Sequence, residues 1–228
     1  VLHPAPDAFG QVTITVRVND GSATTSKAFV VNVLAVNDPP VAAVDEKVAI
    51  EDTVLTIPVA DLTANDSAGP QNESGQTLTV TGVSAASEHG GTVSLSGGIV
   101  TYTPAANFSG SDSFTYVITD NGLTAGVLDA RSATGTVAIS VTPVNDPPVL
   151  ADIPAQEIRE DAEPTRILVP VSDVDSSRDS FVFTATSSDA LIIPGDSPAL
   201  SFTVIDGETF VVLHPAPDAF GQVTITVR

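Results

Sequence analysis

The stretch Val36-Asn37-Asp38-Pro39-Pro40-Val41 occurs twice in the chain, and its second copy is Val144-Asn145-Asp146-Pro147-Pro148-Val149. Each copy follows a run of alternating apolar residues, which predicts that a β-strand ends there. Two consecutive prolines exclude a helix and stop a sheet, and their fixed φ stiffens the segment. The sequence therefore predicts β-domains joined by short, stiff Pro-Pro linkers.

A second repeat sets the period of the chain. Residues 1–17, VLHPAPDAFGQVTITVR, recur unchanged as residues 212–228, an offset of 211 (212 − 1). The two linkers lie 108 residues apart (145 − 37), which leaves 103 (211 − 108) for the rest of the period. The repeating unit is therefore a pair of domains of nearly equal size. Repetition without a single substitution predicts a recently duplicated and much longer tandem array.

These repeats divide the chain into three segments. Residues 1–40 are expected to be the C-terminal part of a B-type β-sandwich plus its linker, and residues 41–144 a complete A-type β-sandwich, here called domain A. Residues 145–228, here called domain B, are expected to be a B-type β-sandwich that lacks its last strand. An incomplete sandwich exposes an unpaired strand edge. The sequence therefore predicts that residues 26–36 of one chain complete domain B of another, unless the chain is one repeat cut from a continuous filament.

Both domains consist of short β-rich runs separated by Gly, Pro, Asn and Asp, and no segment of helical length shows a 3.6-residue period. This pattern predicts an all-β fold of tandem immunoglobulin-like Greek-key β-sandwiches. A single helical turn is predicted at residues 59–66, where Ala and Leu stand between aspartates. Seven strands are predicted in domain A, at residues 48–50, 54–59, 77–83, 92–95, 99–103, 113–118 and 136–142.

Residues 110–120 of domain A align with residues 10–20 of the first segment. In each, alternate apolar residues are expected to face inward. Each strand then runs into a turn, in which Gly122 and Gly21 are expected to accept the positive φ of a hairpin. The inward-facing residues are predicted to be Phe114, Tyr116 and Ile118 in domain A and Ile14, Val16 and Val18 in the first segment.

The chain carries 28 acidic and 8 basic residues, a net charge of −20 that is spread over both domains. Such a field repels nucleic acid and anionic membranes, and its self-repulsion destabilises the fold unless cations neutralise it. Calcium-rich surroundings explain this charge, and so does a need for solubility or a high-salt habitat. Cysteine is absent, which excludes disulfides, thiolate metal sites and cysteine nucleophiles. No stretch reaches transmembrane length, so no membrane insertion is expected.

Taken together, these motifs resemble the cadherin-like and immunoglobulin-like tandem repeats of giant, secreted bacterial surface adhesins. The resemblance implies extracellular, cell-surface β-sandwich modules that often bind calcium and are strung in long arrays. Domain A departs from the family pattern at residues 67–74, SAGPQNES, where an acidic run is usual, and in its long last hairpin at residues 122–132. The motifs that carry the resemblance are VNDPPV at both junctions, Glu51-Asp52-Thr53, Glu160-Asp161-Ala162, DLTAND at 61–66, YTP at 102–104 and DNG at 120–122.

The resemblance to animal cadherins implies calcium ions at the domain junctions. Calcium takes about six to eight oxygen ligands, which separate segments can supply. The corresponding positions elsewhere in the chain are those of Asn37 and Asp38 in the first linker and of Glu160 in domain B, so these are candidate calcium ligands as well. The alternative is that these residues only cap turns through Asx hydrogen bonds, but the joint occurrence of linker, early glutamate and Asp-x-Asp favours calcium. Transferred residue by residue, the A-to-B junction gathers Glu51, Asp52, Asn145, Asp146, Asp173 and Asp175.

No motif for a nucleophile elbow, a zinc protease or a phosphate loop is present, so the sequence does not predict an enzyme. The leading hypothesis is a structural extender, because reach grows with every copy of a repeat. Two alternatives stay open. One is a directly adhesive module that binds a glycan or a cell surface through the long hairpin of domain A. The other is a self-assembling filament, in which neighbouring identical repeats join head to tail.

Overall fold

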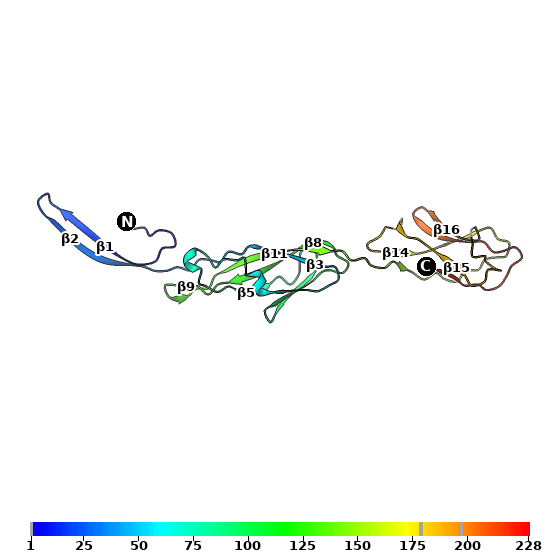
Figure 1. Cartoon of the computed structure of the whole chain (residues 1–228), viewed down its shortest axis with the longest axis horizontal. Coiled ribbons are helices and arrows are strands. Elements are labelled where there is room, and N and C mark those ends of the chain that lie inside the picture. The colour runs from blue at the N-terminus through cyan, green and yellow to red at the C-terminus, as the bar shows by residue number, and fades with distance from the viewer. Residues whose placement is uncertain (1, 178–179, 197) are drawn as a thin grey trace. The chain divides into compact units, whose positions relative to one another are not determined.

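The computed structural model describes residues 2–177, 180–196 and 198–228. Internal contacts divide the chain into two units, Val1–Val144 and Asn145–Arg228. Strands dominate both units (Figure 1). Within the described ranges, no helix has the length and apolar character needed to cross a membrane.

Domain A is a sandwich of two sheets, and all seven predicted strands are present. The chain passes between the sheets at β3/β4, β4/β5, β5/β6 and β7/β8, which is Greek-key connectivity. Strands β3 and β11 pair in parallel over seven residue pairs, whereas the other neighbours in these sheets are antiparallel. One sheet has the order β3 (Val44–Ile50), β11 (Ser132–Thr142), β8 (Gly110–Thr119), β5 (Thr79–Val83), and the other β4 (Leu55–Pro58), β7 (Ile99–Thr103), β6 (Thr92–Ser96).

Two short helical turns and a small hairpin complete domain A. Helix α1 (Val59–Leu62) confirms the predicted helical turn. The 3₁₀ turn η1 (Gln71–Glu73) lies in the stretch that departs from the family pattern. Strands β9 (Leu123–Thr124) and β10 (Val127–Leu128) pair within the long last hairpin.

The core of domain A lies between its two sheets and is built around two tyrosines. Tyr102 and Tyr116 are fully buried, and each hydroxyl has a partner: that of Tyr102 donates to Asp112 Oδ2 at 2.7 Å, and that of Tyr116 lies 3.2 Å from the Leu62 carbonyl oxygen. A Cβ on Gly135 would collide with the Tyr116 ring, so this position requires glycine. The predicted inward face of β8 is confirmed, since Phe114, Tyr116 and Ile118 are all buried.

The first segment is a two-stranded ribbon of β1 (Gly10–Asn19) and β2 (Thr24–Val33), antiparallel over ten residue pairs (Figure 1). Gly21, at φ 96°, turns the chain as predicted. The prediction that Val16 and Val18 face inward is wrong for this copy, because both are exposed. In the described part of this unit, β1 and β2 pair only with each other, and no second sheet covers their apolar face.

In its described residues, domain B has one three-stranded sheet and two strand pairs. Its core gathers apolar side chains such as Ile167, Val169 and Val211. The second copy of the 17-residue repeat covers the end of β17 and all of β18. The sheet has the order β13 (Thr165–Leu168), β17 (Glu208–Leu213), β16 (Leu200–Ile205), and the pairs are β12 (Val149–Leu150) with β14 (Val171–Ser172) and β15 (Ala185–Ser187) with β18 (Ile225–Val227).

Candidate functional site at the first linker

The Asn37 side chain is buried in the end of domain A and is bonded on all sides. Its amide nitrogen donates to Asp120 Oδ1 and to the Asp129 carbonyl oxygen, both at 2.9 Å. Its amide oxygen accepts a hydrogen bond of 2.7 Å from Gln76 Nε2. The backbone N–H of Asn37 donates to Thr124 Oγ1 at 2.9 Å. Domain A therefore recognises this linker residue through every polar group of its amide.

Gly122 creates the space that Asn37 fills. A Cβ at this position would collide with the Asn37 amide. Gly122 was expected to take a positive φ, and this expectation is wrong, because the positive φ values of this hairpin belong to Ala125 (52°) and Gly126 (82°). The chain reverses at those two residues, between β9 and β10, and Gly122 serves close packing instead.

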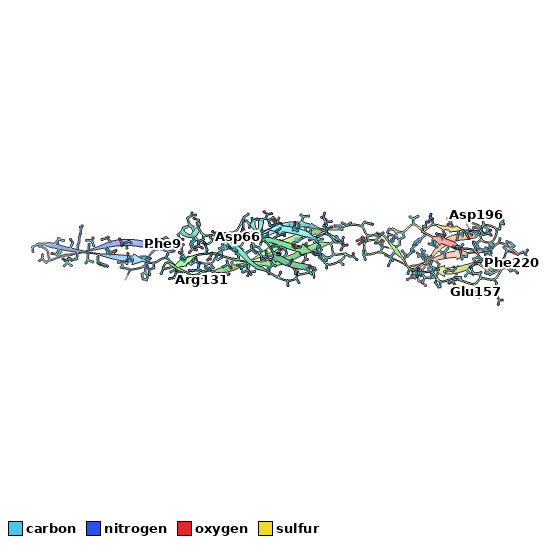
Figure 2. All side chains as sticks on the ribbon, turned by 90° about the horizontal axis from the view of Figure 1, so that it is seen from below. Phe9, Asp66, Arg131, Glu157, Asp196 and Phe220 are labelled. Carbon is cyan, nitrogen blue, oxygen red and sulfur yellow. The ribbon has the colours of Figure 1, made fainter. Side chains whose placement is uncertain are left out.

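The hairpin of residues 122–131 contacts the chain just before Asn37 and is itself held by hydrogen bonds. The N–H of Ala125 donates to the Ala35 carbonyl oxygen at 2.8 Å. The Asp129 carboxylate accepts from Thr124 Oγ1 at 2.6 Å and from Arg131 at 2.8 Å. These hydrogen bonds, first that of Thr124 and then that of Arg131, lower the pKa of Asp129 below its ordinary value. Figure 2 shows Arg131 at the end of domain A that meets the first segment.

Glu73, at the end of η1, binds the next linker residue. The backbone N–H of Asp38 donates to Glu73 Oε1 at 2.9 Å, and Glu73 is buried. Gly69 adopts a φ of 139°, and a Cβ there would collide with the Glu73 carboxylate. The stretch 67–74, which lacks the usual acidic run, thus still brings one carboxylate to the linker.

Three oxygens of this site are buried without a hydrogen-bond partner. They are Glu73 Oε2, Gln76 Oε1 and Asp120 Oδ2. A buried oxygen without a donor is costly, and a bound cation relieves that cost. Across the described ranges, however, no group of three or more Asp, Glu or His side chains is close enough to hold a metal ion. Any cation here would therefore depend on amide or backbone oxygens as well as on Glu73 and Asp120.

The acid pairs Glu51-Asp52 and Glu160-Asp161 occupy equivalent positions in the two domains. Asp52 has a φ of 53° and accepts a hydrogen bond from the Asn107 N–H at 3.0 Å. Asp161 has a φ of 58° and accepts one from the Asp218 N–H at 3.1 Å. Glu160, beside Asp161, is exposed. The sandwiches therefore share this corner, in which the aspartate organises a turn.

Glu51 is buried at the end of domain A. Its Oε2 accepts a hydrogen bond of 2.9 Å from the backbone N–H of Val144, the residue directly before the second linker. Of the six residues predicted for the A-to-B junction, Glu51 and Asp52 thus belong to the first unit, and the other four to the second.

The second linker begins domain B, and its contacts there are of two kinds. The backbone N–H of Asp146 donates to Asp175 Oδ2 at 2.5 Å, which joins the linker to the Asp-x-Asp motif. Asn145 is exposed, and its amide donates to the Asp146 carbonyl oxygen at 2.8 Å. Asp173 Oδ1 accepts from the N–H groups of Asp175 and Ser176, which is the Asx turn of the alternative interpretation.

Sequence reasoning did not find Glu73, Gln76 or Asp120 as linker-binding residues. Gln76 is not acidic, and Glu73 stands outside any Asp-x-Asp pattern. Asp120 precedes Asn-Gly and therefore resembled an ordinary hairpin turn. The signal that was present is the length of the segment after Gly122, which exceeds what a hairpin between two strands requires.

Comparison with known proteins gives one family match. Residues 37–142 match the family model described as Bacterial Ig domain. No protein with a curated description matches the chain.

Among solved structures, mouse protocadherin-24 EC1-3 is 16% identical, with a TM-score of 0.45, over 90% of this chain and 67% of that one. The extracellular cadherin domains 3-6 of protocadherin gamma B2 are 19% identical, with a TM-score of 0.40, over 96% and 54%. A three-domain titin fragment, I67-I69, is 12% identical, with a TM-score of 0.36, over 96% and 69%. The chain thus spans about two thirds of the first structure and about half of the second. Identities and scores this low carry no information on function.

Proposed function

We propose that the chain is a structural extender repeat of a long extracellular adhesin or surface filament, because residues 37–142 match the model of the bacterial Ig domain. Domains of this class are typically extracellular and typically have no catalytic activity. The proposal assigns no reaction to the chain. Its function is to add length between an anchor and whatever the far end of the array contacts.

The observation that carries the proposal is the same contact at both linkers. In each linker, the backbone N–H of the aspartate donates to a carboxylate of the domain that follows: Asp38 to Glu73, and Asp146 to Asp175. The two prolines next to this aspartate fix φ. A linker that is both stiff in itself and bound to the next domain limits bending, which an extender requires and an isolated globular domain does not.

Calcium at the junctions is the second part of the proposal. Support for a cation at the linker end of domain A comes from Glu73 Oε2, Gln76 Oε1 and Asp120 Oδ2, which are buried oxygens without donors. At the A-to-B junction, the proposed ligands remain Glu51, Asp52, Asn145, Asp146, Asp173 and Asp175. When bound, calcium supplies positive charge that offsets part of the net charge of −20.

Thermal unfolding and small-angle X-ray scattering test this proposal. In millimolar calcium, we expect a higher Tm and a narrower distribution of interdomain distances than in chelator, since a ligand that binds only the folded state adds RT ln(1 + [L]/Kd). A potassium solution of equal ionic strength is the control, because simple screening also relieves repulsion between carboxylates. An equal response to potassium and calcium would contradict a specific junctional site.

Head-to-tail self-association is a second candidate function, and one observation favours it. The sequence VTITVR pairs over its whole length with β2 in the first segment, whereas its second copy pairs through β18 with three residues of β15. Val223, Ile225 and Val227 are half-buried, while their counterparts Val12 and Val16 are exposed. A strand with the sequence of β2 would therefore find the same partner residues on β18 of a neighbouring copy.

Light scattering coupled to size exclusion tests self-association. We expect a ladder of oligomers that collapses when residues 1–36 are deleted. A strictly monomeric chain at high concentration would contradict it. A directly adhesive role would depend on Val127 and Leu128, which are exposed at the tip of the domain A hairpin, and specific binding on a glycan array would support that role.

A further inference from the structure

We infer that residues 120–131 of domain A, together with Gln76, form a socket that is specific for a primary amide, and that its ligand is Asn37 of the preceding linker. The socket is a binding site in the strict sense, because it matches both the shape and the hydrogen-bonding pattern of one side chain. The residues that bond the Asn37 side chain lie 39 to 92 positions away from it in sequence.

The hydrogen-bonding pattern of the socket selects asparagine. A primary amide offers two N–H donors and one carbonyl acceptor. In the socket both donations are taken, by Asp120 Oδ1 and by the Asp129 carbonyl oxygen, and the acceptor is taken by Gln76 Nε2. Serine and alanine cannot supply this set, and glutamine carries it one methylene further from the backbone.

Charge excludes the nearest isostere. An aspartate at position 37 would place a second carboxylate within hydrogen-bonding distance of Asp120, which is only 4% exposed. It would also leave the Asp129 carbonyl oxygen without its donor. Like charges in a buried site repel strongly. The socket therefore discriminates between Asn and Asp, although the two side chains have the same shape.

The shape of the socket depends on Gly122 and on the hairpin that follows it. Gly122 is buried directly against the Asn37 amide and leaves no room for a Cβ. Thr124 binds the Asn37 backbone, and Ala125 binds the Ala35 carbonyl oxygen, so the chain is held at the asparagine and two residues before it. The long last hairpin of domain A thus has a function within the chain.

The groups that hold Asn37 all belong to the protein. The joint between the first segment and domain A should therefore stay ordered in chelator. The role of the socket in limiting bending between repeats rests on the proposed function. The socket itself is tested where calcium plays no part, so that a failure of the socket and a failure of the calcium proposal can be told apart.

The experiment uses the whole chain in EDTA and follows amide hydrogen exchange by NMR. The reporters are the N–H groups of Asn37 and Ala125, which bridge linker and hairpin. We expect Asn37→Asp to speed their exchange at least about tenfold, because a buried hydrogen-bond network is lost. The matched control is Asn145→Asp, the same change in the same six-residue context, and it should leave both reporters unchanged.

A swap of the two side chains keeps the test decisive if Asn37→Asp disturbs the whole domain. In Asn37→Asp/Asp120→Asn, the second negative charge is removed from position 120, and the amide oxygen there can still accept from the Gly122 and Arg131 N–H groups, which bond to the same Oδ1 as Asn37 does. We expect partial recovery of protection relative to Asn37→Asp alone. Unchanged exchange in Asn37→Asp, equal loss in Asn145→Asp, or no recovery in the swap would each overturn the inference.

Discussion

The two linkers have the same six residues and different surroundings. Asn37 is buried and makes four hydrogen bonds to domain A, whereas Asn145 is exposed and its amide bonds only to the neighbouring Asp146 carbonyl oxygen among the contacts recorded within its unit. The backbone N–H of the following aspartate, however, is bound by a carboxylate in both places. The shared contact is a property of the linker, and the difference comes from the domain that receives it.

This difference has energetic consequences. Loss of a partner from a buried polar network costs about 1–3 kcal/mol, while changes at an exposed polar residue usually stay within about 0.5 kcal/mol. The same substitution in the two linkers should therefore have unequal effects.

The largest effect is expected from Gly122→Val, which fills the space of the Asn37 amide. We expect domain A to lose about 3 kcal/mol in urea unfolding, because overpacking adds to the lost hydrogen bonds. Gly75→Ala is the matched control, since its Cβ would meet no atom within 4 Å. If the two variants were equally stable, the space at Gly122 would not be needed for Asn37, and burial of Asn37 would not distinguish the first linker from the second.

A smaller effect is expected from Glu73→Gln, compared with Asp175→Asn in domain B. In chelator, the buried Glu73→Gln change should be close to neutral or stabilising, because it removes a carboxylate oxygen that lacks a donor. The calcium-dependent gain of domain A, about 2.7 kcal/mol at 100 times Kd, should disappear. Calorimetric titration of calcium into each variant measures this, and a gain retained in Glu73→Gln would exclude Glu73 as a ligand.

A pH-dependent effect is expected at the first linker. The hydrogen bond from Thr124 Oγ1, and then those from Arg131, hold the pKa of Asp129 below its ordinary value of 3.8. The contribution of Asp129 is therefore complete above pH 3.8 and is lost as the pH falls through the lower pKa of the folded state. NMR shifts of the Thr124 and Asn37 amides should report this loss. In Thr124→Val the midpoint should move up towards 3.8, and an unmoved midpoint would contradict the assignment.

The smallest effect is expected at the tip of the domain A hairpin, which lies against the first linker. Val127 and Leu128 are 70% and 68% exposed. Replacing both by serine should change the stability of domain A by less than about 0.5 kcal/mol. Thermal unfolding measures this, and a larger loss would mean that the tip is covered by another part of the protein.

Much of the fold could be predicted because it is local. Alternation and turn residues located the seven strands of the two sheets of domain A and the turn at α1, but not β9 and β10, and the alignment of residues 110–120 with residues 10–20 identified the buried face of β8. The same alignment gave the wrong result for Val16 and Val18, since burial requires a second sheet and the pattern contains no information on whether one is present.

The site was less predictable, because it depends on contacts between distant segments. Asn37 was identified from its repeated motif, but its partners Gln76 and Asp120 belong to no motif. Gly122 was expected to turn the chain, and its actual role is visible only when Asn37 is in place. The sequence alone does not show whether a glycine is required for close packing or for a positive φ.

The parallel pairing of β3 and β11 determines how domain A responds to tension. β3 follows the first linker and β11 precedes the second, so a pull on the two linkers draws these strands past each other in opposite directions. Their seven residue pairs, from Val44 with Thr136 to Ile50 with Thr142, are then loaded together in shear. An antiparallel pair pulled from adjacent ends would instead unzip one pair at a time. A domain pulled in this direction unfolds only after all seven pairs of β3 and β11 have separated together.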